Sequence, residues 1–286
     1  MHPYLRVILA VSIGATAGIW TKLLHLPATQ MSFFRLAVPA LIVLLYLKVY
    51  KKRTLVRAHA RHMVAASALN AVRVLLYFAA YLYTSLGNAV IMLYTWPIFA
   101  VLWARVILKE KMTGSMKLLL FLSFAGVAIM YGPQKLSVGN SDLIGMSALM
   151  LSAALYALSA VIFKKYLHEY SDMETVFYQN SVGAVLFFPF LFLHPFPAGA
   201  TAGFASLYAF AIGIIGFWLI YSALRKITMV EYGVLSYWEV IGGVLFGMFI
   251  FGETLTPHMM FGGALILASG ILLIAANNKR APKNAP

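Results

Sequence analysis

The sequence contains no cysteine and few acidic residues. Without cysteine the chain cannot form disulfides, bind zinc through thiolates, attach haem covalently or use a thiol nucleophile. Asp and Glu number 8, and all charged residues together make up 10% of the chain, against about a quarter in soluble domains. Apolar residues make up 62%. We therefore expect an integral membrane protein whose main partner is the lipid bilayer.

Basic residues exceed acidic ones, with 22 Lys and Arg and a formal net charge of +14. In a soluble protein this excess would suggest nucleic-acid binding. Here six of the basic residues lie in the single segment 48–61, and most of the others also cluster between apolar runs. Such clusters set the topology of membrane proteins. We therefore expect no nucleic-acid partner.

Ten apolar segments are each long enough to cross about 30 Å of hydrocarbon as a helix. They are 4–24, 30–50, 63–84, 88–108, 115–132, 143–164, 175–194, 203–222, 232–251 and 258–277. Runs of this length predict helices, because lipid leaves the backbone of an open strand without hydrogen-bond partners. The predicted fold class is an all-α integral membrane protein with ten transmembrane helices.

The basic residues also predict the orientation. If both termini are cytoplasmic, the inner loops and helix ends hold 18 of the 22 Lys and Arg residues, and the outer loops hold only Lys135. Cytoplasmic loops carry an excess of Lys and Arg, so we expect both termini on the cytoplasmic side. The absence of cysteine fits a bacterial cytoplasmic (inner) membrane, which is the location we predict.

The two halves of the chain resemble each other at an offset of 143 residues. The segment 90–113, with Tyr94-Thr-Trp96-Pro97, aligns with 233–256, which contains Tyr237-Trp-Glu239. Five helices per half is an odd number, so the second copy would enter the membrane from the opposite side. Inverted repeats are typical of alternating-access transporters, which hold substrate near the midplane between the halves. We expect a first repeat at 4–133 and a second at 143–277.

Several short motifs carry a family resemblance. They are Gly14-Ala-Thr-Ala-Gly18-Ile-Trp20, Phe33-Phe34-Arg35-Leu-Ala, the proline of Tyr94-Thr-Trp-Pro97, and Glu-x-x-Thr at Glu110 and Glu253, each followed by a small-residue helix. In this order and duplication, residues 4 to 277 resemble the drug/metabolite transporter superfamily, specifically its ten-helix EamA-type exporters. The resemblance implies ATP-independent transport of small organic metabolites, often amino acids. Val240 stands where the first copy has Pro97, which predicts a straighter ninth helix.

Polar residues recur on one face of the third segment. Asn70, Arg73, Tyr77 and Tyr81 are spaced by three and four, which places them on one side of a helix. An arginine inside hydrocarbon is costly unless it faces protein or water. A structural ion pair or a helix-locking hydrogen-bond network would account for it. We favour an anion-binding group in a substrate cavity, because ionisable residues within membranes mark transport pathways.

Glu239 is an ionisable residue inside the apolar ninth segment, and it too is costly there unless it faces protein or water. In the repeat it corresponds to Trp96. Three roles are open: partner of Arg73, receptor for a substrate ammonium group, or proton carrier, which makes protons a candidate coupling ion. An amino-acid zwitterion would offer its carboxylate to Arg73 and its ammonium to Glu239. The predicted substrate is accordingly an amino acid or a derivative.

Other residues are candidates for the cavity wall, the gate or helix ends. Aromatic residues on helices with another such marker can stack around a ligand, although packing alone explains any one of them: Trp20, Tyr77, Tyr81, Tyr94, Trp96 and Tyr237. Arg35 either snorkels outward or holds an outer gate. Tyr156, Gln179 and Asn180 either reach the cavity or join helices. Glu110 and Glu253 are expected to cap or orient the next helix.

Motifs of the main alternative classes are missing. The sequence lacks Gly-x-Gly-Asp, His-Glu-x-x-His and the phosphate-binding Gly-x-x-x-x-Gly-Lys-[Ser/Thr] loop. A lipid-modifying enzyme would need a larger catalytic loop. We therefore predict no enzyme activity, no cofactor and no metal site, but secondary active export of an amino acid or derivative. The alternative is uptake or exchange of another small solute, such as an amine, a nucleoside-like cofactor or a sugar derivative. The small residues Gly243-x-x-x-Gly247 suit close packing in either a monomer or a homodimer.

Overall fold

The computed structural model of the protein describes residues 1–51, 59–80, 83–84, 86–132, 140–197, 199–252 and 254–278. Within these ranges all regular elements are helices, so the predicted all-α class is confirmed. In chain order they are α1 (Pro3–Ala15), α2 (Ala17–Leu24), α3 (Ala28–Leu45), η1 (Tyr46–Tyr50), α4 (Ala60–Ala80), α5 (Leu86–Leu93), α6 (Trp96–Ile107), α7 (Gly114–Tyr131), α8 (Asn140–Tyr166), α9 (Asp172–Phe187), η2 (Pro189–Leu193), α10 (Gly199–Phe210), η3 (Ala211–Gly216), α11 (Phe217–Leu224), α12 (Met229–Ser236), α13 (Trp238–Phe251) and α14 (Pro257–Asn278).

Eight helical segments are long and apolar enough to cross a membrane, which makes this a multi-pass membrane protein. They are Thr29–Tyr50, Ala89–Ile107, Gly114–Tyr131, Asp142–Tyr166, Asp172–Leu193, Gly199–Leu224, Met229–Phe251 and Pro257–Asn277. The other two predicted segments correspond to the interrupted pair α1–α2, of which α1 is a shorter apolar helix, and to the 21-residue α4. The arrangement as ten spans with cytoplasmic termini stays a prediction.

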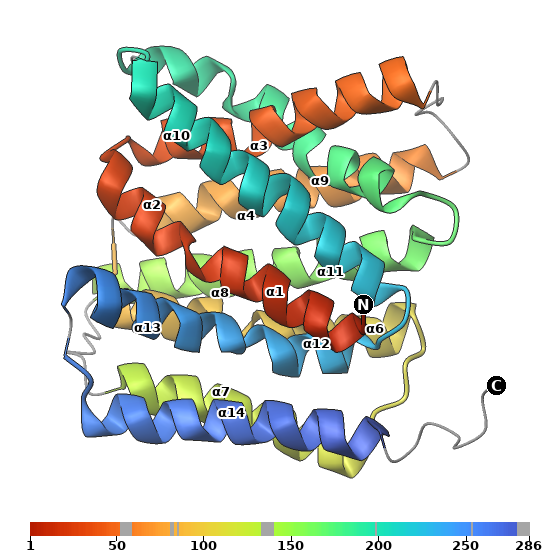
Figure 1. The fold of residues 1–286 in the computed structure, drawn as a ribbon, viewed down its shortest axis with the longest axis vertical. Helices are drawn as coiled ribbons and strands as arrows, with labels where there is room; N and C mark the ends of the chain where they lie inside the picture. Colours follow the sequence, from red (N-terminus) through yellow and green to blue (C-terminus); the bar gives the residue numbers. More distant parts are fainter. Residues whose placement is uncertain are drawn as a thin grey trace.

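The helices run roughly side by side across the molecule, and α14 ends on the same side as the N-terminus (Figure 1). α7 packs along α14 at one edge, while α3 packs along α9 toward the opposite edge. Between these edges, α8 contacts α4 and α6, and α1 contacts α11 and α13. The helices α4, α8, α1 and α11 therefore occupy the middle of the bundle.

Two of the long segments are interrupted at corresponding places. α5 gives way to α6 at Tyr94 and Thr95, and α12 gives way to α13 at Tyr237. At the first break the Thr95 hydroxyl donates to the Met92 carbonyl at 2.6 Å, and at the second Ser236 donates to Gly233 at 2.7 Å. Such side-chain bonds compete with the helical ladder.

The prediction of a straighter ninth helix is therefore wrong. Val240 lies where the first copy has Pro97, and yet the helix is interrupted just before it. A hydroxyl group accompanies each break, and at Thr16, between α1 and α2, a third hydroxyl donates to the Ile13 carbonyl at 2.7 Å. Proline is thus not required for the break at Tyr237.

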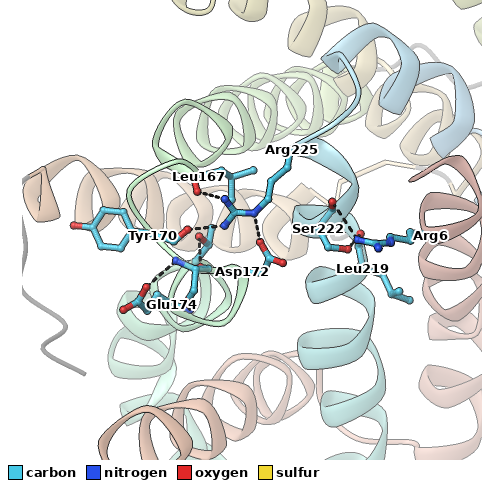
Figure 2. Close-up of polar contacts among 10 residues, drawn as sticks. Arg6, Leu167, Tyr170, Asp172, Glu174, Leu219, Ser222 and Arg225 are labelled. Atoms are coloured by element: carbon cyan, nitrogen blue, oxygen red, sulfur yellow. Dashed lines mark hydrogen bonds and ion pairs between the residues drawn. The ribbon is translucent and has the colours of Figure 1, made fainter. Parts of the chain in front are cut away.

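Polar contacts connect the helix ends on the side where the N-terminus lies. Arg225, just after α11, reaches into the turn between α8 and α9 (Figure 2). It donates to the carboxylate of Asp172 and to the Tyr170 carbonyl, both at 2.6 Å, and also to the carbonyl of Leu167. Since a guanidinium presents its donors in a fixed planar fork, this one side chain fixes the turn against α11.

Glu110 makes a second connection on this side. Its Oε1 accepts from Lys164 of α8 at 2.5 Å, and its Oε2 accepts from the backbone N–H of Met229 at 2.8 Å. Lys164 also donates to the Ile227 carbonyl at 2.6 Å. The sequence predicts that Glu110 caps or orients the next helix, α7. In the structure Glu110 instead accepts from the first residue of α12, and Thr113 caps α7. The corresponding prediction for Glu253 lies outside the described residues.

Candidate functional site

Arg73 lies on α4 and turns toward α8 and α9. Its Nε donates to Asn70 Oδ1 at 3.1 Å, and its Cζ lies 4.6 Å from the ring centroid of Tyr156, within cation–π range. Asn70 is buried, and its Nδ2 donates to the Gln179 carbonyl at 3.0 Å. Asn70 therefore ties α4 to α9 and also orients the arginine.

Arg35 of α3 faces the interior from the other direction. Its Nη1 donates to Asn180 Oδ1 at 3.4 Å, and its Cζ lies 5.1 Å from the ring centroid of Phe217. A Cβ atom added at Gly213 would lie 3.1 Å from the same Nη1, so the guanidinium rests against the π-helical turn η3. The snorkelling alternative for Arg35 is therefore wrong, and its role in gating stays a prediction.

Glu239 is the second residue of α13, directly after the break at Tyr237. Its side chain is half-buried, and its carboxylate lies against α1, where a Cβ added at Gly14 would be 2.8 Å from Oε1. A carboxylate in the first turn of a helix is stabilised by the partial positive charge of the helix N-terminus. Among the described residues, no hydrogen bond or ion pair links Glu239 to Arg73.

These three charges belong to one group of side chains. Arg35, Arg73 and Glu239 lie close enough for their charges to act on one another. Tyrosines from α4, α8, α10, α11 and α12 interact electrostatically with them. We call this group the central polar cluster, and its members are Arg35, Arg73, Glu239, Tyr77, Tyr156, Tyr208, Tyr221 and Tyr232.

Trp96 extends the cluster toward α6, of which it is the first residue. Its ring centroid lies 5.0 Å from that of Tyr156 and 5.2 Å from that of Tyr232. The phenol groups of these two tyrosines also interact electrostatically. The ring of Tyr156 is thus shared between Trp96 and Arg73, as expected if both border one site.

Tyr94 and Tyr237, which occupy equivalent positions in the two halves, touch each other at the two breaks. The Tyr237 hydroxyl donates to the Tyr94 carbonyl at 2.9 Å, and their ring centroids are 6.1 Å apart. Tyr237 is fully buried. This pair holds the two interrupted segments together, and neither residue contacts the three charges through a described hydrogen bond.

Trp20 contacts the central polar cluster through Tyr208. Its ring centroid lies 6.4 Å from the rings of both Phe204 and Tyr208, and Tyr208 in turn interacts with Arg35. Tyr77 interacts with Arg73 and packs against a small apolar cluster of Ala80, Ala89 and Leu149. The predicted Tyr81 lies outside the described residues.

Tyr208 and Tyr221 are not among the site residues predicted from the sequence. Both lie in the predicted segment 203–222, and tyrosine within such an apolar run was a usable signal. The π-helical η3 between them changes the helical register, so the regular spacing of an α-helix could not place them on one face.

A small cavity adjoins the cluster between α8, α9, α11 and α12. Its volume of about 10 Å³ leaves room for about one water molecule. The wall includes Tyr156, Gln179 and Tyr232, and the Oε1 atom of the buried Gln179 has no hydrogen-bond partner in the described part of the chain. This space suits a water molecule and is far smaller than the roughly 300 Å³ or more typical of ligand pockets.

Comparison with known proteins places the chain among transporters. The model described as "EamA-like transporter family" matches residues 2–132 and again residues 143–275. An "Uncharacterized transporter" of Archaeoglobus fulgidus is 24% identical over 96% of this chain and 97% of its own length. Another of that name, from Clostridium kluyveri, is 24% identical over 69% of this chain and 66% of its own length, just under two thirds. A solved crystal structure shares the fold with a TM-score of 0.84 at 15% identity, over 96% of this chain and 98% of the other.

Proposed function

Because the chain belongs to the EamA-like transporter family, within the drug/metabolite transporter superfamily, we propose that it is a secondary active transporter that exports an amino acid or a derivative. The substrate would bind at the central polar cluster, between two inverted repeats. The observation that carries the proposal is this cluster of two arginines and one glutamate beside two interrupted helices. Interrupted helices form the midplane sites of many secondary transporters.

The packing of the helices supports the inverted repeat. If α1–α2, α3, α4, α5–α6 and α7 correspond to α8, α9, α10–α11, α12–α13 and α14, the contacts occur in matching sets. The contact of α4 with α8 corresponds to that of α11 with α1, and the contact of α6 with α8 corresponds to that of α13 with α1. The pairs α3–α9 and α7–α14 join helices to their own counterparts, as an internal two-fold axis requires.

Polar contacts between the two halves suggest how access alternates. Tyr4 of α1 donates to Glu231 of α12 at 2.6 Å and accepts from Asn277 of α14 at 2.8 Å. Glu110 and Lys164 bridge the halves on the same side of the bundle. In an exporter with cytoplasmic termini, these contacts would close the cytoplasmic entrance and would separate when substrate enters from that side.

Uptake or exchange of an amine, a nucleoside-like cofactor or a sugar derivative is the alternative, and it would use the same cluster. A lipid-modifying enzyme is a further alternative, and it would convert its substrate into a different molecule. The proposed oligomeric state is a monomer or a homodimer. Protons remain the proposed coupling ion, with Glu239 as their carrier.

A counterflow screen in proteoliposomes tests the proposal. Labelled amino acids, amines, nucleosides and sugars are offered to vesicles preloaded with the same unlabelled solute. We expect accumulation of one or more amino acids and recovery of the label in unchanged molecules. Net efflux without an opposing solute would support export, whereas a strict need for an opposing solute would support exchange. Accumulation of no solute class would contradict the proposal.

A further inference from the structure

The two arginines of the central polar cluster have more hydrogen-bond donors than acceptors around them. A guanidinium carries five N–H donors. Arg73 uses one of them on Asn70, and Arg35 uses one on Asn180. Neither arginine forms an ion pair within the described part of the chain. Both side chains are half-buried.

Each guanidinium lies beside an aromatic ring. Arg73 Cζ is 4.6 Å from the ring centroid of Tyr156, and Arg35 Cζ is 5.1 Å from that of Phe217. The N–H groups of a guanidinium lie in its plane, along its edge. An edge of this kind can bind a carboxylate through two parallel hydrogen bonds. One N–H group of each arginine is held by an asparagine, so both edges are oriented before a ligand arrives.

The charges of the cluster do not balance. Arg35 and Arg73 carry two positive charges, and in the described part of the chain Glu239 is a carboxylate that acts on both of them. Arg35 and Arg73 also repel each other. Glu239 can compensate one of the two positive charges, and an uncompensated charge away from bulk water is unfavourable. A bound anion with one net negative charge would complete the balance.

We propose that the substrate carries two carboxylates and one ammonium group, as an acidic amino acid does. Each arginine binds one carboxylate, and Glu239 binds the ammonium, so that the substrate's charge of −1 cancels the +1 of the cluster. This inference rests on the proposed function and narrows its substrate class. A neutral amino acid would leave one guanidinium without an anion.

Matched pairs of amino acids test the proposal on the intact protein in lipid nanodiscs. Aspartate and asparagine, or glutamate and glutamine, have nearly the same shape and differ in the second carboxylate. We expect the acid to bind at least about tenfold more tightly than its amide, which is the range for a hydrogen bond to a charged group. Equal binding of acid and amide would overturn the inference.

Variants of Arg35 test whether this residue causes the tighter binding of the acid than of its amide. In Arg35→Gln, the ratio of acid to amide affinity should fall close to one, because the partner of the second carboxylate is lost. Arg105→Gln makes the same change at an exposed residue of α6 and should keep the preference. Arg35→Lys keeps the charge without the planar fork and should give an intermediate ratio, which decides the matter if Arg35→Gln does not fold. An unchanged ratio in the folded Arg35 variants would contradict the assignment.

The counterflow screen separates the two proposals. Transport of neutral but not acidic amino acids would refute the acidic substrate and leave the amino-acid transporter intact. Transport of no solute at all would refute both.

Discussion

Arg73 and Glu239 act on each other electrostatically, but no described hydrogen bond or ion pair joins them. Asn70 and Tyr156 hold the arginine, and the first turn of α13 favours the carboxylate. Neither charge therefore needs the other to keep its place. A substrate with groups of both signs can bind without first breaking an ion pair.

Glu239→Gln tests proton coupling. If Glu239 carries the proton, net flux through the wild-type protein should follow an imposed pH gradient. The residual flux through Glu239→Gln should not respond to the gradient, because an amide side chain does not gain or lose a proton within the pH range of the experiment. The measurement is labelled amino-acid flux in proteoliposomes with the internal pH varied. An equal pH response in both proteins would rule out the coupling role.

At the scale of the element, the packing of α1 against α13 determines where the Glu239 carboxylate lies. Gly14→Ala would place a methyl group 2.8 Å from Oε1, and the carboxylate would have to move. Alanine is favoured over glycine in helices by about 0.5–1 kcal/mol, so stability should not fall. We expect an unchanged or higher unfolding temperature and a loss of about tenfold in substrate affinity, which corresponds to roughly 1.4 kcal/mol of binding.

Gly243→Ala is the matched control for this substitution. Gly243 also lies in a helix, but a Cβ there meets no atom within 4 Å. Its affinity should equal that of the wild type. If Gly14→Ala also binds substrate normally, Glu239 is not held in its binding position by α1.

The ion pair between Lys164 and Glu110 connects the end of α6 to α8, and Glu110 also binds the start of α12. Substitution of Lys164 tests how much this connection contributes to stability. Both side chains are mostly buried, with 12% and 14% exposed, so their pairing is shielded from solvent. Lys164→Met should lower the free energy of unfolding by about 1–3 kcal/mol, since Glu110 loses a charged partner. Lys165→Met, at an exposed neighbour, should have a smaller effect. Thermal unfolding in detergent measures both.

The same pair is expected to keep this side of the bundle closed. Since the chain has no cysteine, a single cysteine at the fully buried Ala223 reports on opening. It should resist a water-soluble thiol reagent in the wild-type background and react in Lys164→Met. Equal labelling in the two backgrounds would show that the pair does not hold the entrance.

At the scale of the whole molecule, composition and long apolar runs were enough to predict an all-helical membrane protein. The spacing of Asn70 and Arg73 predicted that they lie together, because helical periodicity is local. The partners of Glu110 could not be predicted in this way, since they lie 54 and 119 residues away.

Two further features of the structure were not predicted from the sequence, and each has an identifiable cause. The break at Tyr237 was missed because we took proline to be the cause of the first break, whereas a hydroxyl accompanies both. Tyr208 and Tyr221 were missed because η3 alters the register between them. Local deviations from α-helical geometry thus determine which side chains reach the site.

The central claim is that the cluster formed by both halves of the chain is the substrate site. The most direct test is net flux of the counterflow-identified amino acid through wild type, Arg73→Ala, Glu239→Gln and the exposed control Arg105→Ala, at matched amounts of folded protein. The account predicts flux near background for the two cluster variants and wild-type flux for the control. Wild-type flux in both Arg73→Ala and Glu239→Gln would contradict it.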